Sequence, residues 1–231
     1  MSSFVWALAA FVLLHLGASV AGLRDRLVAL VGVGAYRIGF SLATIALMVW
    51  MIHSFGAARG DPFDPINEML WAPPDWGRWA AYILTAFGFV LIASGLITPN
   101  VTRVGGEKGL AAGLEARGIV RVTRHPFLWG VALWAAAHLL VNGERFAPML
   151  FGALGVMALL GTRSIDRKTA KLNPEGWEKF AAQTSNMPFA AIAQGRNQLA
   201  LNELVPGVAA GLVLFAIIGF FHAAFTGAPA F

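Results

Sequence analysis

The sequence contains no cysteine and few charged residues, and both features limit the kinds of site and the class of protein that it can form. Without cysteine there is no disulfide, no thiolate nucleophile and no iron–sulfur cluster. Only 13% of the 231 residues are charged and 58% are hydrophobic, whereas soluble domains carry about 25% charged residues. The mean hydropathy is +0.67. This composition predicts a protein that is embedded in a lipid bilayer.

Six apolar runs have about the length needed to cross a bilayer core of about 30 Å. They cover residues 4–22, 38–55, 79–98, 127–141, 146–162 and 205–225. The fourth run is the shortest, and at about 1.5 Å per residue it reaches only about 22 Å. No internal repeat divides the chain. The predicted fold is therefore all-α, a polytopic integral membrane bundle of about six helices, with residues 1–231 as a single domain.

Lysine and arginine are distributed unevenly among the connections. Three fall between the first and second runs, five between the third and fourth, and six between the fifth and sixth, against Arg59, Arg78 and Arg145 on the other side. The positive-inside rule then places both termini outside the cytoplasm, as expected in a bacterial inner membrane. The first run precedes its basic residues, unlike a secretory signal, so we expect a mature helix. The net charge of +5 predicts contact with membrane lipid and gives no case for nucleic acid.

Two histidines, His15 and His138, lie inside apolar runs, where an imidazole needs a partner. In one interpretation they support helix packing: the small residues after His15, including Ser19, let two helices approach closely, and the imidazole donates across the interface. In the other, the small residues leave room for a flat cofactor whose metal each histidine binds, with Trp134 as an aromatic wall beside His138.

Two single histidines on separate helices match bis-imidazole haem ligation in a helix bundle. A zinc site would need further ligands, and the runs contain no Asp or Glu. Counting residues puts His15 about 16 Å and His138 about 5 Å below the outer edge, so one iron between them requires a tilted or shifted helix. His53 and His222 therefore stay open as rival ligands, or as interfacial residues.

Arg124-His125-Pro126 is typical of a helix start, because proline suits the first turn. Arg124 and His125 then lie at the cytoplasmic end of the helix. They serve either as a positive anchor at the lipid headgroups or as a contact for a carboxylate or phosphate.

The motifs around these residues resemble the NnrU family of membrane proteins, which includes 15-cis-zeta-carotene isomerase. The matching positions are His15-Leu16-Gly17-Ala18-Ser19 with Leu23-Arg24, and Arg124-His125-Pro126 with Gly130, Trp134, Ala137-His138 and Asn142-Gly143. They extend from the first run through the fourth.

The resemblance implies that haem b is held between His15 and His138, the residues matching the family's two ligands, and that a cis double bond is isomerised when the iron is reduced. Ser19, Trp134, Arg124 and His125 are expected near the cofactor. A hydrophobic polyene is then the substrate class. In the bacterial branch, the family name implies a link to nitrite or nitric oxide metabolism, with respiratory or denitrification proteins as partners.

Two alternatives stay open at this stage. The chain could be a noncatalytic haem-bearing assembly factor or sensor. It also resembles membrane methyltransferases that bind S-adenosylmethionine, through Arg124-His125-Pro126 and the later residues 173–180 and 187–189. Those enzymes carry adjacent glutamates in the later segment, whereas Glu175 and Glu178 are separated here.

Overall fold

The computed structural model describes residues 2–17, 22–103, 105–227 and 230, and its regular elements are helices, which confirms the predicted fold class. The chain divides into two compact units. Unit 1 comprises residues 1–72 and 142–157, and unit 2 comprises residues 73–141 and 158–231. Each unit is described by itself below, and the single-domain organisation stays a prediction.

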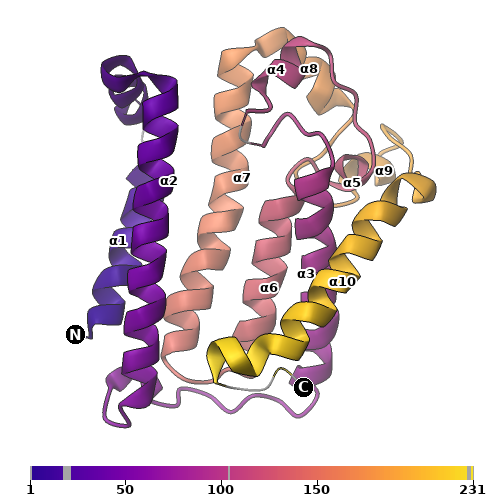
Figure 1. The fold of residues 1–231 in the computed structure, drawn as a ribbon. Coiled ribbons are helices and arrows are strands. Elements are labelled where there is room, and N and C mark those ends of the chain that lie inside the picture. The colour runs from indigo at the N-terminus through magenta and orange to yellow at the C-terminus, as the bar shows by residue number, and fades with distance from the viewer. Residues whose placement is uncertain (1, 18–21, 104, 228–229, 231) are drawn as a thin grey trace. The chain divides into compact units, whose positions relative to one another are not determined.

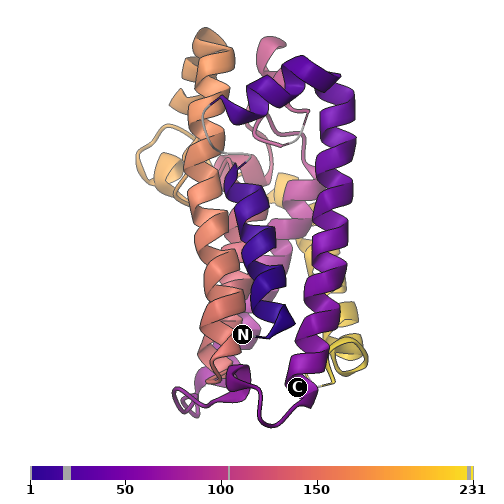
Figure 2. The ribbon, with the colours of Figure 1, turned by 90° about the vertical axis from the view of Figure 1, so that its left-hand side faces the viewer.

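In unit 1 two helices pack side by side, α1 (Ser3–Gly17) and α2 (Leu23–Gly60). Residues spaced three or four apart on α1 form its buried face: Phe4, Ala7, Leu8 and Phe11. The Phe4 ring lies 5.2 Å from that of Phe55, near the end of α2, so the two helices run antiparallel. At Gly32 the backbone of α2 has φ 82° and ψ 157°, which glycine adopts without strain. Figure 2 shows the segment before Gly32 turned across the end of the longer one.

A polar connection closes the other end of unit 1. After η1 (Pro65–Asn67), Met69 pairs with Glu144 in an isolated β-bridge, and Arg145 forms an ion pair with Glu68. The Arg59 guanidinium donates to the Asn67 side chain over 2.8 Å. These bonds join the segment after α2 to residues 142–145, which precede the π-helical turn η2 (Pro148–Gly152) and α7 (Ala153–Leu172).

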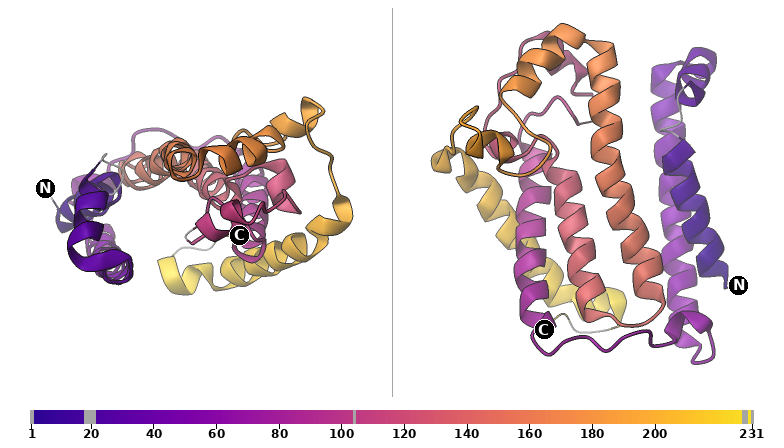
Figure 3. Two further views of the ribbon diagram at one scale, coloured as in Figure 1. Left: turned by 90° about the horizontal axis from the view of Figure 1, so that it is seen from above. Right: turned by 180° about the vertical axis from the view of Figure 1, so that it is seen from behind.

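Unit 2 is organised around α3 (Gly77–Ile97), which contacts both α6 (Pro126–Val141) and α10 (Leu201–Thr226). Glycines make these contacts close. A Cβ on Gly130 of α6 would lie 2.5 Å from the Gly88 carbonyl oxygen of α3, and Gly207 and Gly211 of α10 meet Ser94 and Val90 with no room for a side chain. Figure 3 shows α10 crossing α3 obliquely. Small residues spaced four apart allow this approach in membrane helices.

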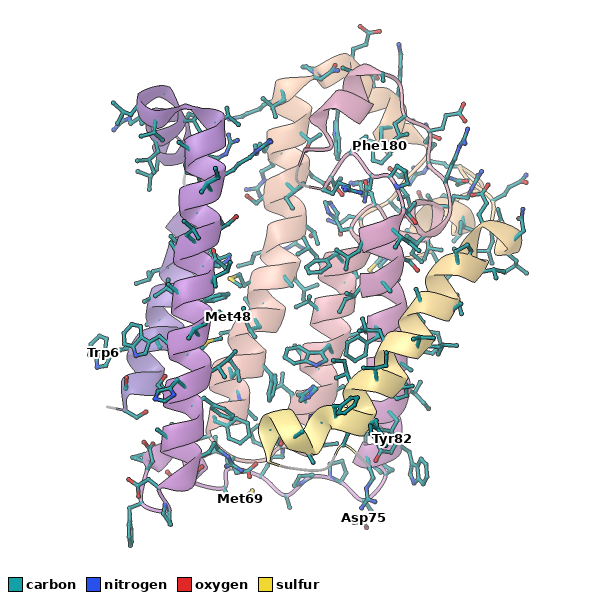
Figure 4. The ribbon with its side chains drawn as sticks, in the orientation of Figure 1. Trp6, Met48, Met69, Asp75, Tyr82 and Phe180 are labelled. Atoms are coloured by element: carbon teal, nitrogen blue, oxygen red, sulfur yellow. The ribbon has the colours of Figure 1, made fainter. Side chains whose placement is uncertain are left out.

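Short helices cover the end of unit 2 where α3 ends and α6 begins (Figure 1). They are α4 (Glu107–Ala111), α5 (Ile119–Val122), α8 (Pro174–Ala182) and α9 (Ala190–Ala193). Apolar side chains of these helices and of the segments between them form a small core that contains Val101, Leu110, Ala116, Ile119, Val120, Val122 and Phe180. Phe180 is labelled in Figure 4. The segments between α3 and α6 and between α7 and α10 therefore fold onto this end of the unit.

All six apolar runs fall in helices over the described residues. Four segments are long and apolar enough to span a bilayer: Leu23–Gly60, Gly77–Ile97, Pro148–Leu172 and Leu201–Ala224. They indicate an integral membrane protein. Helices α1 and α6 have 15 and 16 residues, and at about 1.5 Å per residue they reach about 22 and 24 Å. The second apolar run lies within α2, which also extends before residue 38, and the non-helical backbone at Gly32 separates the part that holds this run from an earlier helical part that begins at Leu23.

Gly130→Ala tests the close contact between α3 and α6. The added methyl overlaps the Gly88 carbonyl, so we expect a loss of about 1–3 kcal/mol of stability, the usual cost of overpacking. Thermal unfolding in detergent measures it. Gly39→Ala on α2 is the control, because nothing lies within 4 Å of the new Cβ and alanine favours a helix over glycine by about 1 kcal/mol. Equal stability of Gly130→Ala and the wild type would contradict the contact.

Candidate functional site

His15 lies near the end of α1, where its imidazole is half-buried and its Nδ1–H donates to the Phe11 carbonyl oxygen over 2.8 Å. The Phe11 ring lies 4.3 Å from the imidazole, and the Phe40 ring of α2 meets it edge-on at 5.4 Å. One turn beyond Phe40, Thr44 Oγ1 is buried and has no hydrogen-bond partner among the described residues. The imidazole of His15 is therefore set among aromatic rings within unit 1.

His138 repeats this arrangement on α6 in unit 2. It is half-buried, its Nδ1–H donates to the Trp134 carbonyl oxygen over 2.9 Å, and the Trp134 ring lies 4.6 Å away. Across from α6, the His222 ring of α10 lies 6.4 Å from that of His138. Trp134 thus contributes both its carbonyl and its ring to the setting of His138, whereas Gly130, on the same helical face, is used in the contact with α3.

In both histidines the proton on Nδ1 is bound to the carbonyl four residues earlier, which places the lone pair on Nε2. Metal-bound histidines in proteins are held this way, with one ring nitrogen donating to a carbonyl and the other binding the metal. Each histidine, in its own unit, therefore fits the role of an axial haem ligand. The buried hydroxyl of Thr44 adds a polar group that a ligand near α2 can satisfy.

The other proposed site residues differ in their settings. His53 is exposed on α2. His222 is half-buried, and Thr226 Oγ1 lies 3.1 Å from its Nδ1 and donates to the His222 carbonyl. Ser19 falls outside the described residues. His222 is accordingly the rival ligand with the more constrained ring.

Arg124 and His125 converge on one carboxylate, that of Asp166 on α7. The guanidinium of Arg124 binds it through two nitrogens, with Nη2 at 2.7 Å from Oδ2 and Nε at 3.0 Å from Oδ1. His125 Nε2 lies 2.6 Å from Asp166 Oδ1. His125 is 3% exposed, and the Arg124 and Asp166 side chains are 14% and 17% exposed. The start of α6 is thus tied to α7 by a buried ionic cluster.

This cluster extends into the turn that follows α8. The Arg124 backbone N–H donates to the Ser185 carbonyl, and Trp129 Nε1 donates to the Asn186 carbonyl. The Arg124 guanidinium also lies 5.1 Å from the centre of the Trp177 ring. The anchor at the lipid headgroups suggested by the sequence is not what forms, since both side chains point inward. The carboxylate contact does form, but to the protein's own Asp166.

Asp166 was not singled out from the sequence. Its one signal is that it is the sole acid in the basic run Arg163-Ser164-Ile165-Asp166-Arg167-Lys168. The partner of a lone acidic residue depends on which helices pack together. The sequence pattern around Asp166 therefore could not predict that it binds Arg124 and His125.

A second ion pair lies at the start of α10. Arg121 binds the Glu203 carboxylate through Nε at 2.9 Å and Nη2 at 3.1 Å, and the Gly118 N–H donates to Glu203 over 2.6 Å. The hydrogen bond to Glu203 raises the pKa of Arg121 above its ordinary value. This pair joins α5 to α10.

The model of the NnrU protein family matches residues 3–230. The chain belongs to the NnrU family. It is 30% identical over 201 residues to the chloroplastic 15-cis-zeta-carotene isomerase of Arabidopsis thaliana, and 30% identical over 197 residues to that of Zea mays. Each alignment covers 82% of this chain and 50% of the relative, so the chain spans about half the length of the curated relatives it matches. No solved structure matches it.

Asp166→Ala tests the ionic cluster. Removing the carboxylate leaves Arg124 and His125 buried without their anion, and we expect a loss of about 3–5 kcal/mol of stability, measured by denaturant unfolding in detergent. Glu175→Ala removes an acid from the exposed pair with Lys179 on α8, and we expect no measurable change. If both variants unfold alike, the cluster does not stabilise the fold.

Proposed function

We propose that this protein is a membrane isomerase that acts on a hydrophobic cis-polyene and binds haem b through His15 and His138. Two observations support the proposal. The chain is similar over 82% of its length to 15-cis-zeta-carotene isomerases, and both histidines hold Nδ1–H on a carbonyl, so that Nε2 carries the lone pair. The second observation carries the ligand assignment.

The aromatic rings beside each histidine suit a planar apolar group. Phe11 and Phe40 border His15, and Trp134 borders His138. Bound haem would supply an iron whose coordination changes with its redox state and which can interact with a double bond. The carbonyls of Phe11 and Trp134 fix the direction of each imidazole, and the rings exclude water from its face.

The surroundings of the site favour an apolar substrate delivered from the bilayer. Helix α1, which carries His15, exposes apolar side chains that include Trp6 and Leu13, and α10, which packs beside α3 in unit 2, exposes Phe220 and Phe221. These exposed apolar side chains are therefore expected to contact lipid. As part of the proposal, the protein lies in a bacterial inner membrane with both termini outside the cytoplasm.

Methyltransferase activity is not part of the proposal. The resemblance to that class depended on Arg124-His125-Pro126 and on residues 173–180 and 187–189, but Arg124 and His125 bind Asp166. Glu175, which is separated from Glu178 and so departs from the class, forms an exposed pair with Lys179.

Haem ligation is tested by absorption spectroscopy of protein purified with haem available. We expect a Soret band and a low-spin reduced spectrum in the wild type, and loss or alteration of both in His15→Ala and in His138→Ala. His53→Ala is the matched control, because it removes an exposed histidine from the same pair of helices as His15.

His222→Ala then separates the rival ligand from the proposed pair. A wild-type spectrum in His222→Ala together with an altered one in His15→Ala supports the assignment. An altered spectrum in His222→Ala together with a wild-type spectrum in His15→Ala would assign iron binding to His138 and His222. A colourless wild type would contradict haem binding altogether.

Isomerase activity is tested by giving purified protein a cis-polyene such as 15-cis-zeta-carotene in liposomes. We expect conversion to the trans isomer when the protein is reduced and little conversion when it is oxidised, measured by chromatography of the extracted polyene. The His138→Ala variant should be inactive in both states. A reduced protein that has the haem spectrum but leaves the polyene unchanged would indicate a noncatalytic assembly factor or sensor.

A further inference from the structure

The first part of α2, residues 23–31, is a helical piece with a direction of its own. Gly22 precedes it with φ 85° and Gly32 ends it with φ 82°, values that side chains other than glycine rarely adopt. The chain can therefore change direction at both ends of the piece. Figure 2 shows it turned across the end of the longer part of α2. The histidine site does not explain why this part of α2 is set apart.

Apolar side chains of this piece form one stripe along the helix. With about 3.6 residues per turn, positions that are four, seven and eight residues after the first share its face. The stripe consists of Leu23, Leu27, Leu30 and Val31, which are 45%, 41%, 80% and 56% exposed. A continuous row of exposed apolar side chains marks a surface that contacts another molecule or a membrane.

The charged residues of the piece are arranged around this stripe. On a helix of this pitch Arg24 and Arg26 fall on its two borders, whereas Asp25 falls on the opposite side. The Arg24 guanidinium lies 5.7 Å from the centre of the Tyr36 ring and 3.3 Å from the Asp25 carboxylate, and Arg26 is exposed. Basic side chains beside an apolar face are typical of helices that lie in a membrane surface, because their long stems reach the phosphates while the apolar face enters the acyl chains.

The depth of the piece in the bilayer follows from the rest of α2. The apolar run 38–55 has 18 residues and at about 1.5 Å per residue spans about 27 Å, close to a bilayer core of about 30 Å. Gly32 lies six residues before the run, or about 9 Å beyond it, and each headgroup layer is about 5–8 Å thick. Tyr36 and Arg37, which lie between, are of the types that anchor helices at this level. The turn at Gly32 therefore comes at the lipid headgroups.

We propose that residues 23–31 lie flat in the headgroup layer of the leaflet that surrounds this end of α2. The apolar stripe enters the acyl chains, Arg26 contacts lipid phosphates, and Asp25 faces water. Phospholipid is the partner because the piece is continuous with a helix that is long and apolar enough to cross the bilayer and because it begins at the depth of the phosphates. The proposal depends neither on haem binding nor on isomerisation.

Single cysteine substitutions test this orientation, because the chain has no cysteine of its own. A polarity-sensitive fluorophore is attached to Leu30→Cys on the stripe and, as the matched control, to Asp25→Cys on the opposite side. Both positions are exposed, so labelling should leave the fold unchanged. The full chain is reconstituted in nanodiscs of phosphatidylcholine and phosphatidylglycerol, with one chain per disc.

We expect the emission of the label at residue 30 to be shifted to the blue relative to that at residue 25. Lipids that carry a spin label on the upper part of the acyl chain should quench the label at residue 30, and aqueous iodide should quench it little. The label at residue 25 should show the opposite pattern, because it faces water.

A label at Leu23→Cys tests whether the stripe holds the piece in place. The double variant Leu27→Ser, Leu30→Ser should abolish the quenching of this label by spin-labelled lipid, because the remaining stripe is too short to enter the acyl chains. Ala29→Ser is the control, since residue 29 is exposed and lies off the stripe, and it should leave the quenching unchanged.

Four results would overturn the proposal. Equal quenching of residues 25 and 30 by iodide would show that the stripe faces water, and equal quenching by spin-labelled lipid would place the whole piece in the acyl chains. Protection of residue 30 from both quenchers would show that protein covers the stripe. Unchanged lipid quenching in the double serine variant would show that the stripe does not anchor the piece.

Discussion

The hydrogen bond between a histidine Nδ1–H and the carbonyl four residues earlier is the constraint on which the candidate site depends. A polar side chain in an apolar helix must find its partner inside the protein, because lipid offers none. His15 and His138 both meet this demand within their own helix. This bond within the helix orients each imidazole, and with it Nε2, before any ligand binds.

Close contacts at glycines fix the positions of three helices of unit 2 relative to one another. Helix α3 meets α6 at Gly88 and Gly130, and it meets α10 at Gly207 and Gly211. Contacts without side chains leave little freedom to slide, because each helix would have to force a carbonyl or a side chain into its neighbour. The register of α6 determines where His138 lies, and the register of α10 determines where His222 lies. Their ring separation of 6.4 Å therefore follows from packing that is distant from both.

The sequence predicted the helices well and their ends less well. Apolar runs identify helices because lipid demands that backbone groups be satisfied within the segment, and over the described residues each run lies almost entirely in a helix. The bend at Gly32 was not predicted, because the apolar run that predicted this helix began only at residue 38. Asp166 was missed for another reason: its role depends on α6 and α7 lying side by side, which no local pattern encodes. His15, His138 and Trp134 were found because an isolated imidazole in an apolar run is conspicuous in itself.

The ionic cluster at Asp166 explains why one motif suggested two classes of protein. Arg124 and His125 are suited to hold a carboxylate at the start of a helix, whether that carboxylate belongs to a cofactor or to the chain. Here Asp166 supplies it from α7, and the backbone N–H of Arg124 binds the Ser185 carbonyl at the same place. The motif therefore fixes the first turn of α6, while His138 lies thirteen residues after His125, near the other end of the helix. A site for an external anion at the start of α6 would need the aspartate to move, and its removal would leave two buried groups without an anion. The proposed chemistry therefore belongs at the other end of α6, where the Trp134 carbonyl accepts a hydrogen bond from the imidazole of His138.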